Sequence, residues 1–438
     1  MATLLSMYEF DNDFLKPDPH AIKPQLGPTD RPKSLAALDV RQSVLEEIAL
    51  KTLYLSGSLS VLELAEKMRL GYEVVDALFS QLRAEQLCLV TGMTGHVHQI
   101  AITAQGRTRA TELLTHCHYT GAAPVSFERY CEQTRKQSVK KVDVCAADVQ
   151  RGFAHLVVDP ETLRKLGTAL NSGSSVFIWG PAGTGKTTMA ETLSKVLADD
   201  LVWIPYAVEV DGQIITVFDP SIHKRVQESE PEDRDARWLL CQRPSVLVGG
   251  ELTAEMLDLQ FNPTSKFYVA PAQMKANNGV LIIDDFGRQR LRPEELLNRW
   301  VVPLDRRIDF LTLAGGKKIE VPFEMLVVFA SNMDPAELVD PAFLRRIQTK
   351  IRVGEVSDQQ FCEIFRRVAA TNQVAYDASI PFDLIDFIRT HLQQELRSCY
   401  PRDIVNQVCW SARYEGRKPY VDRPALRQAI EAYFLAKS

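Results

Sequence analysis

The 438-residue sequence contains no apolar run that approaches the roughly 20 residues needed by a membrane-spanning helix, so it predicts no transmembrane segment. Its first 19 residues also lack a basic stretch, and acidic residues interrupt their apolar run, which argues against a secretory signal. We therefore expect a cytoplasmic protein that has no membrane partner.

The chain also lacks an excess of basic residues, because 51 Lys and Arg stand against 56 Asp and Glu and give a net charge of −5. No overall positive field is present to hold nucleic acid non-specifically. The eight cysteines form no C-x-x-C pair, which argues against a zinc ribbon and favours reduced thiols. Cys117 lies between His116 and His118, but neighbours two residues apart do not share a helix face, so we expect no metal site there.

What the sequence does contain is a globular composition, with 45% hydrophobic and 24% charged residues, which excludes disordered, collagen and coiled-coil proteins. Its length predicts about two or three domains. Residues 1–34 include a proline-rich stretch with little apolar periodicity, and we expect them to form a flexible arm. Residues 121–154 are expected to form a linker of mixed composition.

Between these two segments, residues 35–120 show a compact pattern of helices and strands. Helical periodicity appears around residues 44–48, 60–68 and 72–85, and two short strands, 88–93 and 96–103, follow on either side of a turn. Three helices followed by a β-hairpin resemble a winged-helix (α+β) domain, in which the third helix would enter the DNA major groove.

The charges on the third helix disfavour DNA binding. Residues 72–85 carry Glu73, Asp76 and Glu85 against a single Arg83. Acidic side chains are repelled by phosphates. We therefore expect this domain to bind a protein partner, and DNA recognition remains the alternative.

A nucleotide-binding pattern follows. Residues 176–179 form an apolar strand that runs directly into GPAGTGKTT and then into a helical pattern, which is the context that a phosphate-binding glycine loop requires. The loop's backbone N–H groups would cradle the phosphates of ATP, Lys186 would neutralise the β and γ phosphates, and the Thr187 hydroxyl would bind Mg²⁺. The expected nucleotide-binding residues are Gly180, Pro181, Ala182, Gly183, Thr184, Gly185, Lys186, Thr187 and Thr188.

Two further apolar strands end in polar residues suited to hydrolysis. VLIIDD places Asp284 to bind Mg²⁺ and Asp285 to act as catalytic base, although Asp is one methylene shorter than the usual Glu and slow turnover is possible. EMLVVFASNMDP ends at Asn332, which can contact the attacking water or the γ-phosphate. The alternative for Asn332 is a turn-forming residue.

Three arginines are further candidates for contact with phosphate. Arg345 and Arg346 stand at a helix end in DPAFLRRI, and Arg402 lies in the first turn of a later helix in CYPRDIVNQV. The planar guanidinium group donates two parallel hydrogen bonds to phosphate and keeps its charge.

In this order the motifs resemble those of AAA+ ATPases: GPAGTGKTT is similar to Walker A, LIIDD to Walker B, Asn332 to sensor 1, Arg345 and Arg346 to arginine fingers, and Arg402 to sensor 2. The similarity covers roughly residue 153 to the C-terminus. It implies an α/β nucleotide-binding domain with a parallel sheet at 155–353 and a helical lid at 354–438. It also implies ATP hydrolysis by a hexameric ring in which the fingers reach a neighbour's ATP.

Residues 251–285 resemble the helix-2-insert group, which includes MoxR-like ATPases, because a hairpin turning at Asn262-Pro263 precedes the Walker B strand. By that likeness Phe267 and Tyr268 would lie near a pore, and the equally weighted alternative is that they pack against a sheet. Residues 201–226 predict another β-hairpin, turning at Asp211-Gly212. The charged run 228–237 is expected to be a solvated loop.

The functional hypothesis is a ring-forming ATPase that remodels or assembles a protein partner. The alternative is a DNA-bound regulator or loader that uses the N-terminal domain for recognition. A third possibility, suggested only by Asp285, is a signalling switch that binds ATP and scarcely turns it over.

Overall fold

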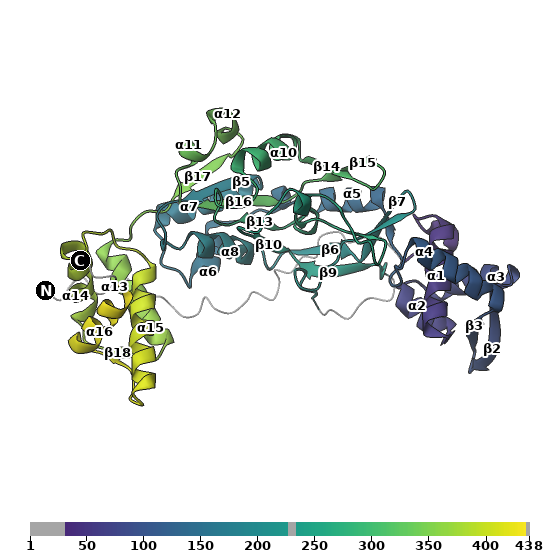
Figure 1. The fold of residues 1–438 in the computed structure, drawn as a ribbon, viewed down its shortest axis with the longest axis horizontal. Coiled ribbons are helices and arrows are strands. Elements are labelled where there is room, and N and C mark those ends of the chain that lie inside the picture. Colours follow the sequence, from purple (N-terminus) through teal and green to yellow (C-terminus); the bar gives the residue numbers. More distant parts are fainter. Residues whose placement is uncertain (1–30, 227–233, 435–438) are drawn as a thin grey trace.

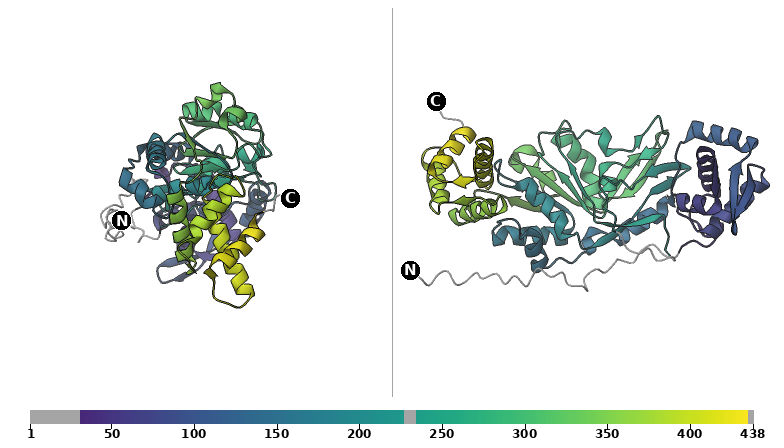
Figure 2. Two further views of the ribbon diagram at one scale, coloured as in Figure 1. Left: turned by 90° about the vertical axis from the view of Figure 1, so that its left-hand side faces the viewer. Right: turned by 90° about the horizontal axis from the view of Figure 1, so that it is seen from below.

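The computed structural model describes residues 31–226 and 234–434, which form three units along one long axis (Figure 1). The N-terminal helices lie at one end, a parallel sheet and a second β-rich region lie in the middle, and a helical unit lies at the other end. The right panel of Figure 2 shows the same order from below. Most of the expected arm at 1–34 lies outside the described residues. Across the described ranges, no helix is both long and apolar enough to cross a bilayer.

The N-terminal unit contains the expected three helices and the hairpin. Its elements are α1 (Gln42–Ser56), β1 (Ser58–Ser60), α2 (Val61–Met68), α3 (Tyr72–Ala84), β2 (Cys88–Thr94), β3 (Val97–Ile102) and α4 (Ala104–His116). The strand β1 was not expected, and it completes an antiparallel sheet in the order β1-β3-β2. Helix α2 begins with a capping box in which Ser60 and Glu63 satisfy each other's backbone N–H groups.

Residues 121–154 are not the linker that their mixed composition indicated. They contain β4 (Val125–Ser126), α5 (Phe127–Lys136) and α6 (Ala146–Phe153), and β4 pairs in parallel with β7 (Ala207–Val210). The buried face of this segment is partly polar, since Gln133 and Thr134 are 5% and 2% exposed. Apolar periodicity therefore underestimates how deeply the segment is packed.

A parallel sheet forms the centre of the molecule. Its strands, in spatial order, are β10 (Ser245–Val248), β13 (Val280–Ile283), β16 (Leu326–Ser331), β5 (Ser175–Trp179) and β17 (Thr349–Arg352). One face is covered by α6, α7 (Pro160–Ser172) and α8 (Lys186–Val196), and the other by α10 (Pro293–Arg306), α11 (Pro335–Leu338) and α12 (Pro341–Leu344). Burial on both faces explains the uninterrupted apolar runs of the strands. The expected α/β class is confirmed.

A second β region is inserted between α8 and β13. It comprises β6 (Leu201–Pro205) paired with β9 (Trp238–Gln242), and a sheet in which β11 (Gln260–Phe261), β12 (Tyr268–Val269) and β8 (Gln213–Thr216) continue into β7 and β4. The short α9 (Ala272–Lys275) and the hairpin of β14 (Ile308–Thr312) and β15 (Lys318–Pro322) adjoin it. Asp211 and Gly212 have φ values of +50° and +83°, as a type I′ hairpin turn requires.

The hairpin at Asn262-Pro263 is also present, and both Phe267 and Tyr268 pack against neighbouring residues. Tyr268 is 2% exposed, and its hydroxyl accepts a hydrogen bond from the Ala314 amide. The Phe267 ring packs edge-on against Tyr119 of the N-terminal unit. The packing alternative therefore describes both residues in this chain.

The C-terminal unit is almost entirely helical and has its own core. Its helices are α13 (Asp358–Thr371), α14 (Ile380–Thr390), α15 (Cys399–Tyr414) and α16 (Arg423–Tyr433). The sequence predicted helices alone, but the short strands β18 (Ala375–Tyr376) and β19 (Tyr420–Val421) also pair in parallel. Each strand has only two residues, too few to show an alternating pattern.

A buried arginine joins the N-terminal unit to the β region. Arg237 is completely buried, and it donates to both carboxylate oxygens of Asp235, at 3.0 and 2.8 Å. It also contacts the Asp39 carboxylate at 2.7 Å and the Pro124 carbonyl oxygen at 2.9 Å. The expected solvated loop at 228–237 is therefore wrong for its last residues, while residues 227–233 lie outside the described residues.

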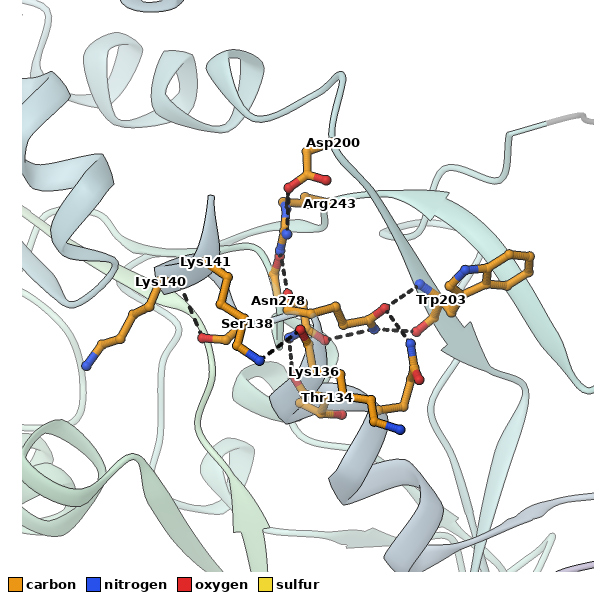
Figure 3. A network of polar contacts seen from close by, with 11 residues as sticks. Thr134, Lys136, Ser138, Lys140, Lys141, Asp200, Trp203, Arg243 and Asn278 are labelled. Atoms are coloured by element: carbon orange, nitrogen blue, oxygen red, sulfur yellow. Dashed lines mark hydrogen bonds and ion pairs between the residues drawn. The ribbon is translucent and has the colours of Figure 1, made fainter. Parts of the chain in front are cut away.

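A second buried network ties the β region to the central sheet (Figure 3). The Gln137 side chain binds both the backbone N–H and the backbone C=O of Trp203, at 2.9 and 2.7 Å, and also contacts Asn278. Arg243 donates to Asp200 at 2.7 and 2.9 Å and to the Gln137 carbonyl oxygen at 2.9 Å. Because Arg243 and Asn278 precede β10 and β13, the network fixes where these strands begin.

The Arg237 cluster generates a stability prediction. Replacing Arg237 by Met should lower the free energy of unfolding by about 3–5 kcal/mol, because two carboxylates lose their buried partner. Denaturant unfolding of the full chain measures the change. Arg41→Met is the matched control, because its ion pair with Glu209 joins the same two regions while the Arg41 side chain is 58% exposed. It should cost less than about 1 kcal/mol, and equal losses in the two variants would contradict the prediction.

Candidate functional site

The glycine loop connects the end of β5 to the start of α8. Gly183 and Gly185 have φ values of +81° and +90°, which glycine adopts without steric cost. A Cβ atom on Gly180 would lie 2.0 Å from the carbonyl oxygen of Val353, so the close approach of that backbone also requires glycine. The loop's shape thus depends on all three glycines of the motif.

Lys186 closes the loop onto itself. Its Nζ donates to the Pro181 carbonyl oxygen at 2.7 Å, and the residue is 7% exposed. Burial lowers the pKa of Lys186, and the nearby carboxylate of Asp284 opposes that shift. The Thr184 hydroxyl donates to the same carbonyl oxygen at 3.0 Å. A phosphate group that displaced this carbonyl would give the lysine a negatively charged partner.

Thr187 and Asp284 form the contact expected of a Mg²⁺ site. The Thr187 hydroxyl lies 3.0 and 2.9 Å from the two carboxylate oxygens of Asp284, and it donates to them. Mg²⁺ is held by one or two carboxylates together with nucleotide phosphates and water, so this pair of oxygen ligands fits it. Within the described ranges, no cluster of three or more His, Cys, Asp or Glu residues could hold a metal by itself.

Asp285 and Asn332 meet across neighbouring strand ends. The Asn332 side-chain amide donates to Asp285 Oδ1 at 3.3 Å. Asp285 adopts a φ of +48°, in the left-handed region, and is exposed. The Asn332 side chain therefore reaches the second acid of the Walker B-like motif.

These residues surround a cavity of about 550 Å³. Of the predicted site residues, those that line it are Ala182, Gly183, Thr184, Gly185, Lys186, Thr187, Thr188, Asp284, Asp285, Asn332 and Arg402. Apolar side chains from 156–158 and from α13, including Ile364 and Val368, line it as well. Gly180 and Pro181 shape the loop without lining the cavity.

Arg345 and Arg346 stand outside this cavity. They follow α12, and Arg346 pairs with Asp305 of α10 at 2.9 Å, while Arg345 is exposed. Neither residue contributes to the cavity wall of its own chain. The structure therefore does not bring these two arginines to the loop that the rest of the motif surrounds.

The C-terminal unit touches the glycine loop directly at the start of α15. The Ser398 hydroxyl and the Cys399 backbone N–H both donate to the Gly183 carbonyl oxygen at 3.1 Å. Arg402 lines the cavity, but its side chain is 63% exposed and pairs with Asp403 at 2.9 Å. The loop and the helical unit are thus joined through one carbonyl group.

Sequence reasoning missed three other arginines around this site. Arg352 ends β17 beside Trp179, and the carboxyl-edge rule for parallel strands would have found it. Arg367 of α13 lines the cavity and donates to the Ala154 carbonyl oxygen at 2.7 Å. Arg397 lies near the loop, and its buried Nε has no hydrogen-bond partner in the described part of the chain. No local sequence pattern marks Arg367 or Arg397 as a site residue.

Comparison with known proteins adds three findings. Residues 357–432 match a family model described as a domain of unknown function (DUF8689). No curated protein matches the chain. Many solved structures are similar.

Three of the similar structures illustrate the range. The RuvB Holliday junction branch migration motor of Thermotoga maritima has 15% identity and a TM-score of 0.37, covering 63% of this chain and 69% of its own. NtrX from Brucella abortus in complex with ADP has 14% identity, a TM-score of 0.38 and coverages of 72% and 62%. Domain III of the Thermotoga maritima replication initiation protein DnaA has 12% identity, a TM-score of 0.38 and coverages of 64% and 95%. At this level of similarity, function must be argued from the site itself.

The contact between Gly183 and α15 predicts the effect of adding one methyl group. A Cβ atom on Gly183 would lie 2.5 Å from the Cys399 Sγ and 3.5 Å from its Cβ. Gly183→Ala should therefore weaken nucleotide binding, because the loop and the helix must separate. The overpacking should also lower the free energy of unfolding by about 1–3 kcal/mol. Titration with a fluorescent ATP analogue measures the binding.

Two further variants control this experiment. Adding Cys399→Ala to Gly183→Ala removes the clashing sulfur and should recover part of the loss, with the strain of the positive φ remaining. Gly92→Ala, in β2 of the N-terminal unit, places its Cβ in open space and should bind nucleotide normally. If the double variant bound no better than the single one, the contact would not be the cause.

Proposed function

We propose that this protein is a Mg²⁺-dependent ATPase of the AAA+ type. The observation that carries the proposal is the Thr187–Asp284 contact, because it joins a complete glycine loop to the acid at the end of β13. A glycine loop alone can bind many kinds of phosphate compound. Binding of a Mg²⁺-nucleotide complex also requires a loop threonine close to an acid at a strand end.

The lining of the cavity supports an arrangement for ATP. The phosphates would lie against the backbone N–H groups of the loop, where Lys186 would exchange its bond to Pro181 for the β and γ phosphates. The base would lie among the apolar side chains of Leu156, Ile364 and Val368. These side chains come from both the sheet unit and the helical unit, so one nucleotide would hold the two units together.

Hydrolysis would depend on the Asp285–Asn332 pair. Mg²⁺ bound with the nucleotide would neutralise charge that develops on the phosphates. Asp285 would accept a proton from the attacking water, and Asn332, already 3.3 Å from Asp285, would orient that water. The missing methylene of Asp285 favours a low turnover rate. A switch that binds ATP without hydrolysing it is the corresponding alternative.

The position of Arg345 and Arg346 supports a shared site. Arginines that complete a phosphoryl-transfer site stabilise charge on the transferring phosphoryl group, yet these two residues lie outside their own cavity. A ring of copies, a hexamer by the AAA+ likeness, would bring them to a neighbour's ATP. Arg402 would sense the nucleotide from the helical lid within the same chain.

The N-terminal unit would recognise the partner in the cytoplasm, and we propose a protein partner. The winged-helix likeness leaves DNA binding as the alternative, but Glu73 and Glu85 are exposed on or beside α3 and would face the phosphates.

The helix-2-insert likeness rests on the β11–β12 hairpin. Its tip is held to the end of α4 by a hydrogen bond from the His118 amide to the Ser265 carbonyl oxygen.

Two variants test the proposed ATPase. Lys186→Ala should abolish ATP binding, because the loop loses the cation aimed at the β and γ phosphates. Asp284→Asn should still bind ATP but lose Mg²⁺-dependent phosphate release. The substitution removes the negative charge of the proposed Mg²⁺ ligand and keeps the shape of the side chain. Calorimetric titration and a phosphate-release assay separate these effects. Turnover at the wild-type rate in Asp284→Asn would rule out the Mg²⁺ assignment.

The shared site has a complementation test. The single variants Arg346→Ala and Arg345→Ala should each still bind ATP. The hydrolysis rate of each should fall roughly 10³- to 10⁵-fold if the arginine acts in trans. Mixing Arg346→Ala with Lys186→Ala should restore part of the activity, because one chain brings an intact loop and the other an intact arginine. A wild-type chain that sediments as a monomer and is fully active would contradict the ring.

A further inference from the structure

The helical unit meets the sheet unit at a second place, in addition to the contact at Gly183. Arg367 of α13 donates from one guanidinium nitrogen, Nη1, to the carbonyl oxygens of Ala154 and Leu156, at 2.7 and 3.2 Å. Both acceptors lie in the short connection between α6 and α7. At both places, therefore, the helical unit donates hydrogen bonds to backbone carbonyl groups of the sheet unit.

The Arg367 contact supplies what the end of α6 requires. Ala154 is the C-cap residue of that helix. The last carbonyl groups of an α-helix have no partner within the helix, and they lie at the negative end of its dipole. A guanidinium group offers both N–H donors and a permanent positive charge. Arg367 thus caps α6 from a helix that lies 213 residues later in the sequence.

Glu363 fixes the direction of the Arg367 guanidinium. It lies one turn earlier in α13, and its Oε1 accepts from Arg367 Nε at 2.7 Å. Because the guanidinium group is planar, a bond at Nε also sets where Nη1 points. Hydrogen bonds, first from Arg366 and then from Arg367, lower the pKa of Glu363 to about 2, so this carboxylate stays charged at neutral pH.

The segment that Arg367 holds forms part of the nucleotide cavity. Residues 155–158 line it, as do residues from one face of α13, namely Gln360, Ile364, Arg367 and Val368. The apolar members of this set are the side chains among which the base would lie. The glycine loop and Lys186 form a different part of the lining. Arg367 therefore joins two walls of the base-binding part and makes no bond to the phosphate-binding loop.

We propose that Arg367 is a positioning residue for the nucleotide base. By capping α6 from the helical unit, it holds residues 154–158 against α13 in the arrangement that encloses the base. The inference rests on the proposed nucleotide site, but it concerns the base and not the phosphates. Loss of Arg367 would loosen the wall around the base and leave the phosphate contacts of the loop in place.

Calorimetric titration of the full-length protein with two ligands, each with Mg²⁺, tests the proposal. ADP carries the base, whereas tripolyphosphate carries phosphate groups alone. Arg367→Met keeps an apolar stem and removes the donors, and it should weaken ADP binding roughly tenfold, because two charge-assisted hydrogen bonds to the wall are lost. The same variant should bind tripolyphosphate as the wild type does, because Lys186 and the glycine loop are unchanged.

Arg366→Met is the matched control. Arg366 is the next residue along α13, and it donates to both carboxylate oxygens of the same Glu363 at 2.7 Å. Its side chain is 60% exposed, it does not line the nucleotide cavity, and within the described ranges it makes no hydrogen bond to the sheet unit. This variant removes the same charge from the same helix and should leave the affinity for ADP unchanged.

Three results would overturn the proposal: wild-type affinity for ADP in Arg367→Met, an equal loss of tripolyphosphate binding in that variant, or an equal loss of ADP binding in Arg366→Met. If Arg367→Met does not fold, Arg367→Lys takes its place. It must also lower the affinity for ADP, since lysine keeps the charge but lacks the planar fork. A wild-type chain that binds neither ligand would instead reject the proposed nucleotide site, and the role of Arg367 with it.

Discussion

The parallel alignment of β13, β16 and β5 is the constraint on which the candidate site depends. Ile283 lies opposite Phe329, and Ser331 lies opposite Trp179, so all three strands end at one edge of the sheet. The residues that follow these strands, the two acids, Asn332 and the glycine loop, must then meet there. A shift in register between any two strands would separate Thr187 from Asp284, and the Mg²⁺ ligands would no longer converge.

Buried arginines hold the other regions at fixed positions relative to that edge. Arg237 joins the N-terminal unit to the β region, and Arg243 joins the β region to the starts of β10 and β13. A buried ion pair is a weak source of stability, because desolvation offsets much of the attraction, but it tolerates few geometries. These contacts therefore favour one relative orientation of the regions that they join.

The sequence predicted the site better than its surroundings, for a physical reason. Walker-like motifs are contiguous and follow apolar strands, so Lys186 and Asp284 could be placed without a structure. The segment 121–154 was misjudged because the buried residues Gln133 and Thr134 are polar and interrupt the apolar periodicity. The Gln133 side chain donates to Gln137, and the Thr134 backbone carbonyl oxygen accepts from Asn278. The end of the charged run was misjudged because Arg237 is buried in ion pairs. A run of charged residues in a sequence usually indicates a solvent-exposed loop. Arg397 reaches the loop only through tertiary packing.

The contact at Gly183 shows how nucleotide and helical unit would influence each other. The Gly183 carbonyl oxygen accepts two hydrogen bonds from the start of α15, while residues 182–188 line the cavity that would hold the phosphates. The Gly183 carbonyl group and the Thr184 N–H belong to one planar peptide unit, so these two groups cannot rotate independently. A loop that tightens around phosphate must therefore either carry Ser398 and Cys399 with it or break their bonds. In both cases the position of α15 would depend on a bound nucleotide, so this contact would couple the loop to the helical unit.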